Sequence, residues 1–215
     1  MSRLRRMVKP ARAKMARRRH RHFLKAVDDL PRPLRVLDVG GSQRFWELVG
    51  MTDPQDVEVT LMNIKKMPTR YPNFRSVVTD ARDMRVFKDD EFDVVFSNSV
   101  IEHVGTLEDQ TRMASEVARV GKRYFVQTPN RYFPIEPHFY FPFFQFLPVR
   151  LRVWLVKALP LASYGRMKDR EKAEAFVKEI RLMNARELQA LFPGATLLRE
   201  KTAGLTKSFM VLGSR

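Results

Sequence analysis

The sequence contains no cysteine. This absence excludes a disulfide framework, a thiol nucleophile and a zinc site built on thiolates. There is also no apolar run near the ~18 residues that a membrane-spanning helix needs, and the amino terminus lacks the apolar core of a secretory signal. We therefore expect a cytoplasmic protein, for which any contact with a membrane would be peripheral.

Acidic residues are missing from the beginning of the chain, where none occurs before Asp28. The net charge is +16, and eleven of the 40 Lys and Arg residues lie in this acid-free stretch. These eleven are Arg3, Arg5, Arg6, Lys9, Arg12, Lys14, Arg17, Arg18, Arg19, Arg21 and Lys25. Much of the basicity therefore belongs to an arm or helix, residues 1–27, ahead of a domain predicted at 28–215.

Three explanations of the basic arm stay open: a solvated extension, a contact with an anionic membrane, and a contact with nucleic acid. Phe23 is its only aromatic residue, which disfavours a reader of single-stranded bases. Apolar residues follow helical spacing among the bases, as an interfacial helix requires: Leu4, Met7, Ala11 and Met15. Pro10 is expected to interrupt that helix. Ser2 is the only serine of the arm, and a mitochondrial presequence would contain more.

Strand and helix patterns alternate after the arm. With 215 residues and 44% hydrophobic content, the chain can bury one good core. The predicted strands are 34–39, 57–64, 75–79, 92–97 and 124–127, and the predicted helices are 43–49 and 107–120. This alternation indicates a parallel sheet that is covered on both faces.

The end of the chain has a different pattern. A helix at 187–191 precedes two strands, 195–200 and 208–212, which are joined by a short turn around Gly204. Such a closing pair is antiparallel. The predicted fold is therefore α/β, a Rossmann-like, doubly wound and mostly parallel sheet of seven strands with an antiparallel terminal hairpin.

Polar residues stand where several of these strands end. The first strand runs into Asp38 and then into Gly40 and Gly41, where bare backbone suits a polar cofactor as well as an ordinary turn to a helix. Asp80 follows the third strand, and Asn98 with Ser99 follows the fourth. Because parallel strands end at one edge, these residues are expected to form one site.

On these motifs the chain resembles class I S-adenosylmethionine-dependent methyltransferases of the small-molecule type. The resemblance covers residues 33–130 well and the terminal hairpin loosely. It implies S-adenosyl-L-methionine as cofactor, with Asp38, Gly40 and Gly41 against its methionine part. Ser42 stands where the family usually has a second glycine, and its small side chain keeps a close approach open.

The resemblance also assigns the adenosine part of the cofactor. It places Asn63 at the position of the acid that binds the ribose, where an amide oxygen accepts hydrogen bonds without a charge. Asp80 matches the acid that receives the adenine amine, and Ala81 would offer its backbone to the ring. Asn98 and Ser99 would lie where the cofactor and acceptor sites meet. From the residues alone, Asp80 also suits a cap of a helix near Asp83.

Other functions of this fold fit the residues less well. A nicotinamide dehydrogenase needs a Gly-x-Gly-x-x-Gly turn and an acid on the second strand, and both are missing here. Some O-methyltransferases hold a metal with Glu-x-x-Glu-His, but Ser99 replaces the first glutamate ahead of Glu102 and His103. Two ligands seldom hold a hard cation. We therefore predict no metal site and expect His103 to pack or to support another residue.

An aromatic and proline-rich insertion follows the fifth predicted strand, at about residues 131–165. Prolines fix its backbone, and its rings supply large apolar area. Arg150, Arg152 and Lys157 alternate there with apolar residues, as in an element at a membrane interface. The segment is interpreted either as a plug on the core or as a lid over a small-molecule, glycan or lipid-linked acceptor.

Glu136 and His138 are the only acid and imidazole in the first part of this insertion. If the acceptor is a hydroxyl, histidine suits removal of its proton at neutral pH, so His138 is the candidate catalytic base. The function predicted from the sequence is methyl transfer by direct displacement. Two alternatives remain: a non-catalytic protein of this fold that docks through its arm, and an RNA methyltransferase.

Overall fold

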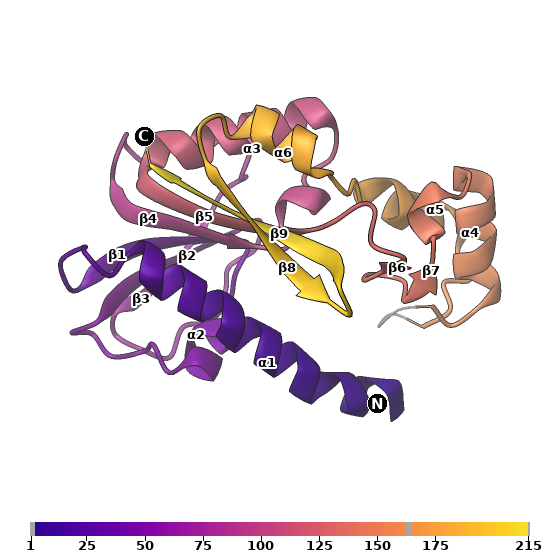
Figure 1. The fold of residues 1–215 in the computed structure, drawn as a ribbon, viewed down its shortest axis with the longest axis horizontal. Helices are drawn as coiled ribbons and strands as arrows, with labels where there is room; N and C mark the ends of the chain where they lie inside the picture. The colour runs from indigo at the N-terminus through magenta and orange to yellow at the C-terminus, as the bar shows by residue number, and fades with distance from the viewer. Residues whose placement is uncertain (1–2, 162–164, 215) are drawn as a thin grey trace.

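The computed structural model describes residues 3–161 and 165–214, and it contains a seven-stranded sheet (Figure 1). In spatial order the strands are β3 (Phe74–Val78), β2 (Val57–Asn63), β1 (Leu34–Val39), β4 (Phe92–Asn98), β5 (Gly121–Pro129), β9 (Leu205–Ser214) and β8 (Thr196–Thr202). The first five are mutually parallel, and β9 pairs antiparallel with β5 and β8. The predicted fold class is confirmed.

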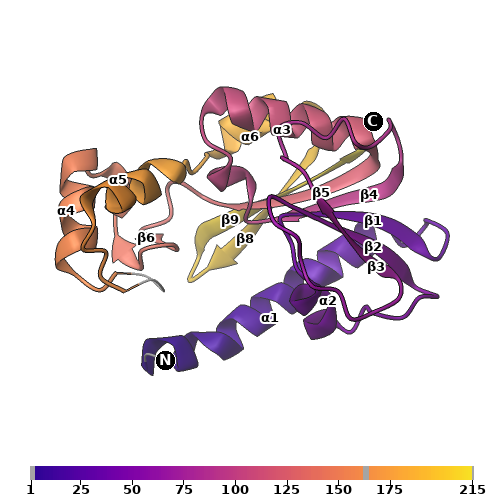
Figure 2. The same ribbon diagram turned by 180° about the vertical axis from the view of Figure 1, so that it is seen from behind.

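Helices cover both faces of the sheet. On one face lie α1 (Arg3–Ala26) and α2 (Gln43–Val49), and on the other lie α3 (Leu107–Val120) and α6 (Ala185–Leu191) (Figures 1 and 2). The central strands are consequently buried on both sides, which explains why their sequences are nearly continuous apolar runs. The order β3-β2-β1-β4-β5 reverses direction between β1 and β4, where open α/β sheets bind ligands.

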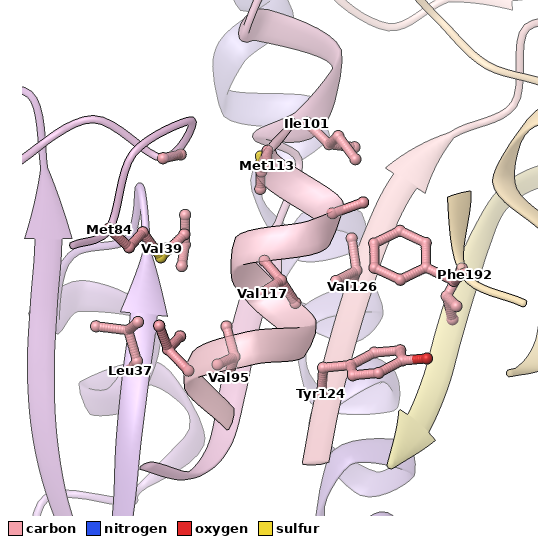
Figure 3. Packing of buried hydrophobic residues seen from close by; sticks show 14 of the residues in the cluster. Leu37, Val39, Met84, Val95, Ile101, Met113, Val117, Tyr124, Val126 and Phe192 are labelled. Carbon is pink, nitrogen blue, oxygen red and sulfur yellow. The ribbon is translucent and has the colours of Figure 1, made fainter. Parts of the chain in front are cut away.

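The predicted helix at 107–120 is found as α3. Thr106 and Asp109 form a reciprocal capping box at its first turn, which satisfies backbone N–H groups that the helix leaves unpaired. Met113 and Val117 project from one side of α3 onto side chains of the sheet, among them Val95 and Val126 (Figure 3). This contact fixes α3 over β4 and β5.

The basic arm forms the helix α1, and its second half belongs to the core. Phe23 is fully buried, and its ring lies 5.2 to 6.0 Å from the rings of Trp46, Phe96 and Phe125. The expected interruption at Pro10 does not occur, and α1 continues through this residue although proline removes one helical hydrogen bond. Arg19 pairs with the buried Glu200 of β8 at 2.8 Å.

The segment between β5 and α6 includes the insertion that was predicted at about 131–165. It contains β6 (Ile135–Glu136), β7 (Phe141–Pro142), the 3-10 helix η2 (Phe144–Phe146), α4 (Val149–Ala158) and α5 (Arg170–Glu179). A bridge between Asn130 and Met183 closes its base, so the inserted segment reaches residue 182. It has a separate apolar cluster that includes Phe139, Phe144 and Val177, and it stands beside the main sheet (Figures 1 and 2).

None of the helices in the described parts of the chain is long and apolar enough to cross a membrane. Most predicted element boundaries agree with the structure to within a few residues. The helices at 43–49 and 107–120 are found with the predicted bounds, and the terminal hairpin is found as β8 and β9. The strand predicted at 124–127 is longer in the structure, where β5 spans Gly121–Pro129, because it pairs with β4 on one side and with β9 on the other.

Candidate functional site

A cavity of about 530 Å³ opens where the parallel strands end. Its lining comes from the carboxyl ends of β1 and β2, the loops that follow β3 and β4, and α5 of the insertion: Val39, Gly40, Met62, Asn63, Ile64, Thr79, Asp80, Ala81, Arg82, Ser99, Val100, His103, Val104, Gly105 and Glu179. Another cavity, of about 390 Å³, lies near Arg35 and Phe92 at the amino ends of the strands. Because open α/β sheets bind ligands at the carboxyl ends, the first cavity is the candidate site.

The glycine turn after β1 forms one wall of the cavity. Gly40 has φ of 70°, and a Cβ atom there would lie 2.6 Å from Cγ2 of Val100. A side chain on Gly41 would collide with the carboxylate of Asp38. Both positions therefore require glycine, one for its backbone angle and one for the close approach of Asp38.

Asp38 lies beneath this turn and is not among the residues that line the cavity. It is 1% exposed, and its Oδ2 accepts a hydrogen bond of 2.8 Å from Nε1 of Trp46. Burial raises the pKa of Asp38 to about 7, although the bond from Trp46 acts in the opposite direction. The structure thus gives Asp38 a supporting position behind Gly40 and Gly41, and its predicted contact with the cofactor stays a prediction.

Asn63 connects the end of β2 to the glycine turn. Its Nδ2 donates to the carbonyl of Gly41 at 3.3 Å, and its Oδ1 accepts from the N–H of Ile64 at 3.2 Å. An amide oxygen accepts two hydrogen bonds, so Oδ1 keeps one site for a ligand hydroxyl. This geometry is compatible with the predicted ribose contact.

Asp80 is held by Arg82 at the far side of the cavity. The Arg82 side chain donates to both Asp80 oxygens, at 3.0 and 2.7 Å, and this pair holds the pKa of Asp80 below its usual value. The backbone N–H of Arg82 also donates to Asp80 Oδ1 at 2.9 Å. Asp80 therefore caps a turn rather than the helix considered from the sequence. Ala81 next to it lines the cavity, and its predicted contact with the adenine stays a prediction.

The two polar residues at the end of β4 point to different places. Ser99 has φ of 59°, lines the cavity, and donates through Oγ to Oε1 of Gln127 at 2.9 Å. Asn98 instead accepts a hydrogen bond of 3.0 Å from Nη1 of Arg19 on α1 and is not among the lining residues. Ser42 is likewise outside the lining, as the residue preceding α2. For Asn98 and Ser42, cofactor contact remains a prediction that this arrangement does not favour.

A polar cluster borders the cavity on the side of the insertion, and in it Glu102 is buried while His103 and His138 are half-buried. The ligating atoms of Glu102, His103 and His138 lie within 4.8 Å of one another, a grouping that could hold a metal ion. Oε1 of Glu136 lies 2.6 Å from Nδ1 of His138. Glu102 accepts a hydrogen bond of 2.9 Å from Oγ1 of Thr128 at the end of β5. The insertion therefore carries His138 to the loop that follows β4.

Burial and neighbouring charges shift the pKa values of Glu102, His103 and His138 in different directions. Burial raises the pKa of Glu102 to about 6. Burial also lowers the pKa of His103, and the neighbouring His138 lowers it further. For His138 burial acts downward as well, but the hydrogen bond and charge of Glu136 outweigh it and leave the pKa raised. The region thus favours positive charge on His138.

Several residues of the site were missed by the sequence interpretation. Thr79, Arg82, Val100 and Glu179 line the cavity, and none of them belongs to a recognised motif of the sequence. Glu179 in particular comes from α5, which lies beyond the predicted end of the insertion. The amphipathic spacing of the sequence after residue 165 is the signal that could have indicated α5 and thus Glu179.

Comparison with known protein families supports the assignment of the fold. Residues 42–124, less than half of the chain, match the family model described as a methyltransferase domain. This range includes β2, β3, β4 and α3, and thus most of the cavity lining. No curated protein sequence matches the chain.

Solved structures with the same fold are distant in sequence. A CurJ carbon methyltransferase superposes with a TM-score of 0.55 at 12% identity, covering 89% of this chain and 51% of that one. The N-terminal domain of EvdMO1 gives 0.54 at 15% identity, with coverages of 93% and 82%. A SAM-dependent methyltransferase from Aquifex aeolicus gives 0.52 at 11% identity, with coverages of 90% and 87%. The chain thus spans about half the length of the CurJ structure, and these likenesses concern the fold alone.

Proposed function

We propose that this chain, a class I S-adenosylmethionine-dependent methyltransferase, transfers a methyl group by direct displacement to a hydroxyl of a small-molecule, glycan or lipid-linked acceptor. The observation that carries the proposal is the cavity at the carboxyl ends of β1, β2 and β4, which adjoins the cluster of Glu102, His103 and His138. One region suits the methyl donor, and the other suits a hydroxyl that must lose its proton.

The residues of the cavity fit S-adenosylmethionine. Its volume of about 530 Å³ lies in the range of roughly 300 to 1,000 Å³ that is typical of ligand sites. Gly40 has no side chain, so a ligand can approach its backbone closely. Asn63 offers an amide oxygen for a ribose hydroxyl. Asp80 and Ala81 line the part of the cavity proposed for the adenine. When bound, the cofactor supplies a sulfonium methyl, whose C–S bonding pair returns to sulfur as the acceptor oxygen bonds to carbon and releases its proton.

The acceptor is expected on the side of the insertion. His103 and Glu179 line the cavity there, and His138 lies directly behind His103, with ring centroids 4.7 Å apart. Imidazole and carboxylate groups at this position can take the hydroxyl proton, and the residues of the wall hold the oxygen in line with the methyl group. His138 as the base stays a proposal. The EvdMO1 domain was crystallised with S-adenosylhomocysteine and D-fucose, which makes a sugar hydroxyl a reasonable first acceptor to test.

A lipid-linked acceptor would place the insertion at a membrane. Tyr132, Phe143 and Trp154 are 63%, 56% and 61% exposed, and Arg150 is exposed between them in sequence. Exposed rings beside bases suit an anionic lipid surface. Phe23 is buried in the core, so it cannot stack on a base, and this weakens the nucleic-acid alternative for the arm.

The proposed function is tested first by calorimetry. S-Adenosylhomocysteine should bind the folded chain with one site, and absence of binding would refute the methyltransferase assignment. Methyl transfer from radiolabelled S-adenosylmethionine is then measured against panels of sugars, nucleotide sugars, phenols and RNA. Labelling of RNA alone would overturn the hydroxyl acceptor proposed here.

Contact with a membrane is tested separately. The chain is sedimented with vesicles of anionic or of zwitterionic phospholipid, and binding only to the anionic vesicles is expected. Trp154→Ala should weaken that binding, whereas Leu48→Ala, at an exposed position on α2, should not. Equal effects of the two variants would reject the insertion as the membrane contact.

A further inference from the structure

We infer that Glu102, His103 and His138 bind one divalent transition-metal cation, and that the hydroxyl of the acceptor is a further ligand of this ion. The second part rests on the proposed function, while the first is a statement about the protein alone. The residues come from two segments, since Glu102 and His103 follow β4 and His138 belongs to the insertion. Only the folded chain brings them together.

The separation of the three residues is close to that of a metal site. Their ligand atoms all lie within 4.8 Å of one another. Bonds from a metal to nitrogen or carboxylate oxygen measure about 2.0 to 2.2 Å, so two ligands of one ion lie roughly 3 to 4 Å apart. Small rotations of the side chains are enough to close the remaining difference.

One of the ligand atoms has unused hydrogen-bonding capacity. Among the described residues, the buried Oε1 of Glu102 has no hydrogen-bond partner. Nδ1 of His103 lies 3.4 Å from Oε1 of Glu179, with which it forms an ion pair when the ring is charged. Because buried polar atoms are almost always paired, an unpaired carboxylate oxygen beside two imidazoles points to a ligand that it would contact.

The surrounding residues orient two of the three ligands, His138 and Glu102, as the outer residues of metal sites do. Glu136, which is 1% exposed, lies against Nδ1 of His138 and leaves Nε2 of that ring for a cation. Thr128 donates to Oε2 of Glu102 and leaves Oε1. A carboxylate behind a ligating histidine fixes the tautomer and strengthens the ligand.

The type of ligand selects the ion. Two imidazoles and one carboxylate suit Zn²⁺, Mn²⁺ or Fe²⁺, whereas Mg²⁺ and Ca²⁺ prefer oxygen ligands. The sequence prediction of no metal counted only Glu102 and His103, and the fold adds His138. Three protein ligands leave positions for a hydroxyl on the side where His103 lines the cavity. A bound cation lowers the pKa of such a hydroxyl and thereby aids release of its proton.

As a ligand of the cation, His138 has a different role from that of a catalytic base. As a base, His138 would act without metal, and treatment with a chelator would leave turnover unchanged. As a ligand, it requires the cation, so turnover should fall with the chelator and return when Zn²⁺ or Mn²⁺ is added. Chelation therefore separates the two roles.

Binding is tested with the metals themselves on the full chain. After dialysis against a chelator, Zn²⁺ and Mn²⁺ are titrated by calorimetry, and Mn²⁺ is also followed by electron paramagnetic resonance. We expect one site per chain. Glu102→Gln and His138→Ala should weaken binding at least tenfold, and Glu136→Gln by roughly 10 to 100-fold through loss of the outer carboxylate. The control His22→Ala removes a histidine of α1 outside the cluster and should bind normally.

Binding of S-adenosylhomocysteine serves as an independent readout of folding and of the proposed function. The wild type and the variants should all retain it. No metal binding to a wild type that binds S-adenosylhomocysteine would overturn the cation site alone, as would equal binding by all variants. Metal binding without S-adenosylhomocysteine binding would support the site and refute the methyltransferase function.

Discussion

The indole Nε1–H of Trp46 donates a hydrogen bond of 2.8 Å to Oδ2 of Asp38, beneath the glycine turn. Both residues are almost completely buried, and Gly41 lies against the same carboxylate. The turn that borders the cavity thus rests on an acid whose ionisation is opposed by burial.

The free energy of unfolding should depend on pH through Asp38. Its pKa in the folded chain is about 7, against an ordinary value of 3.8. Because the folded pKa is raised, the contribution of Asp38 is fully present below about pH 4 and is lost as pH rises through about 7. Asp38→Asn keeps an acceptor for Trp46 and cannot ionise. Between about pH 4 and 8, urea unfolding should show its stability relative to wild type rising by on the order of 4 kcal/mol.

Asp93 provides a matched control for this measurement. Burial opposes its ionisation, but hydrogen bonds from Arg35 and Lys122 outweigh burial and lower its pKa to about 2. Its stabilising contribution is therefore complete above about pH 4 and is lost only in stronger acid. The stability difference between wild type and Asp93→Asn should stay flat from about pH 5 to 8. A flat difference for Asp38→Asn as well would contradict the assignment.

Asp80 should be needed for cofactor affinity. It lines the cavity, and loss of a hydrogen bond to a charged group costs about 1.5 to 3 kcal/mol. Asp80→Ala should therefore weaken binding of S-adenosylhomocysteine at least tenfold by calorimetry. Asp83→Ala removes a nearby acid that pairs with Arg85 and is not among the lining residues, so its affinity should be unchanged. Similar losses in both variants would indicate a general effect on the loop.

His138 should affect turnover without affecting the cofactor. His138→Ala should lower kcat at least tenfold, whether the ring takes a proton or holds a cation, and the Kd of S-adenosylhomocysteine should not change. Steady-state kinetics with the acceptor found in the panel gives the first quantity and calorimetry the second. Turnover near the wild-type value would remove His138 from both roles.

The second half of α1 should be essential for folding. Phe23 is fully buried against three aromatic rings, so Phe23→Ala should destabilise the chain by about 3 to 5 kcal/mol in urea unfolding. The exposed neighbour Arg21 is the control, and Arg21→Ala should change stability little. If Phe23→Ala were equally mild, α1 would be dispensable to the core.

The role of Phe23 also decides how the arm can be tested. Deleting the first 25 residues would remove a core side chain together with the charge, so loss of function would have two causes. Replacing the exposed Arg17, Arg18 and Arg21 by glutamine removes charge alone. Reduced binding to anionic vesicles with unchanged S-adenosylhomocysteine affinity would assign the arm to membrane contact, and unchanged binding to both would leave it a solvated helix.

The sequence by itself determined the sheet, the glycine turn and the residues at the strand ends. Apolar runs, helical spacing and the glycines at 40 and 41 are local signals, because each depends on neighbours within a few residues. They predicted β1, α2 and α3 with their observed bounds. They also placed Gly40, Asp80 and Ser99 at the strand ends, where the cavity is found, and the family resemblance added Asn63 and Ala81.

Only the tertiary structure decided which distant residues meet. Asn98 turns to Arg19, Phe23 enters the core and His138 reaches Glu102 and His103. Each of these contacts joins segments separated by tens of residues, and their positions are set by packing of α1 and of the insertion rather than by local propensity. The cavity at the strand ends could therefore be predicted from the strands, while the polar cluster beside it required the fold.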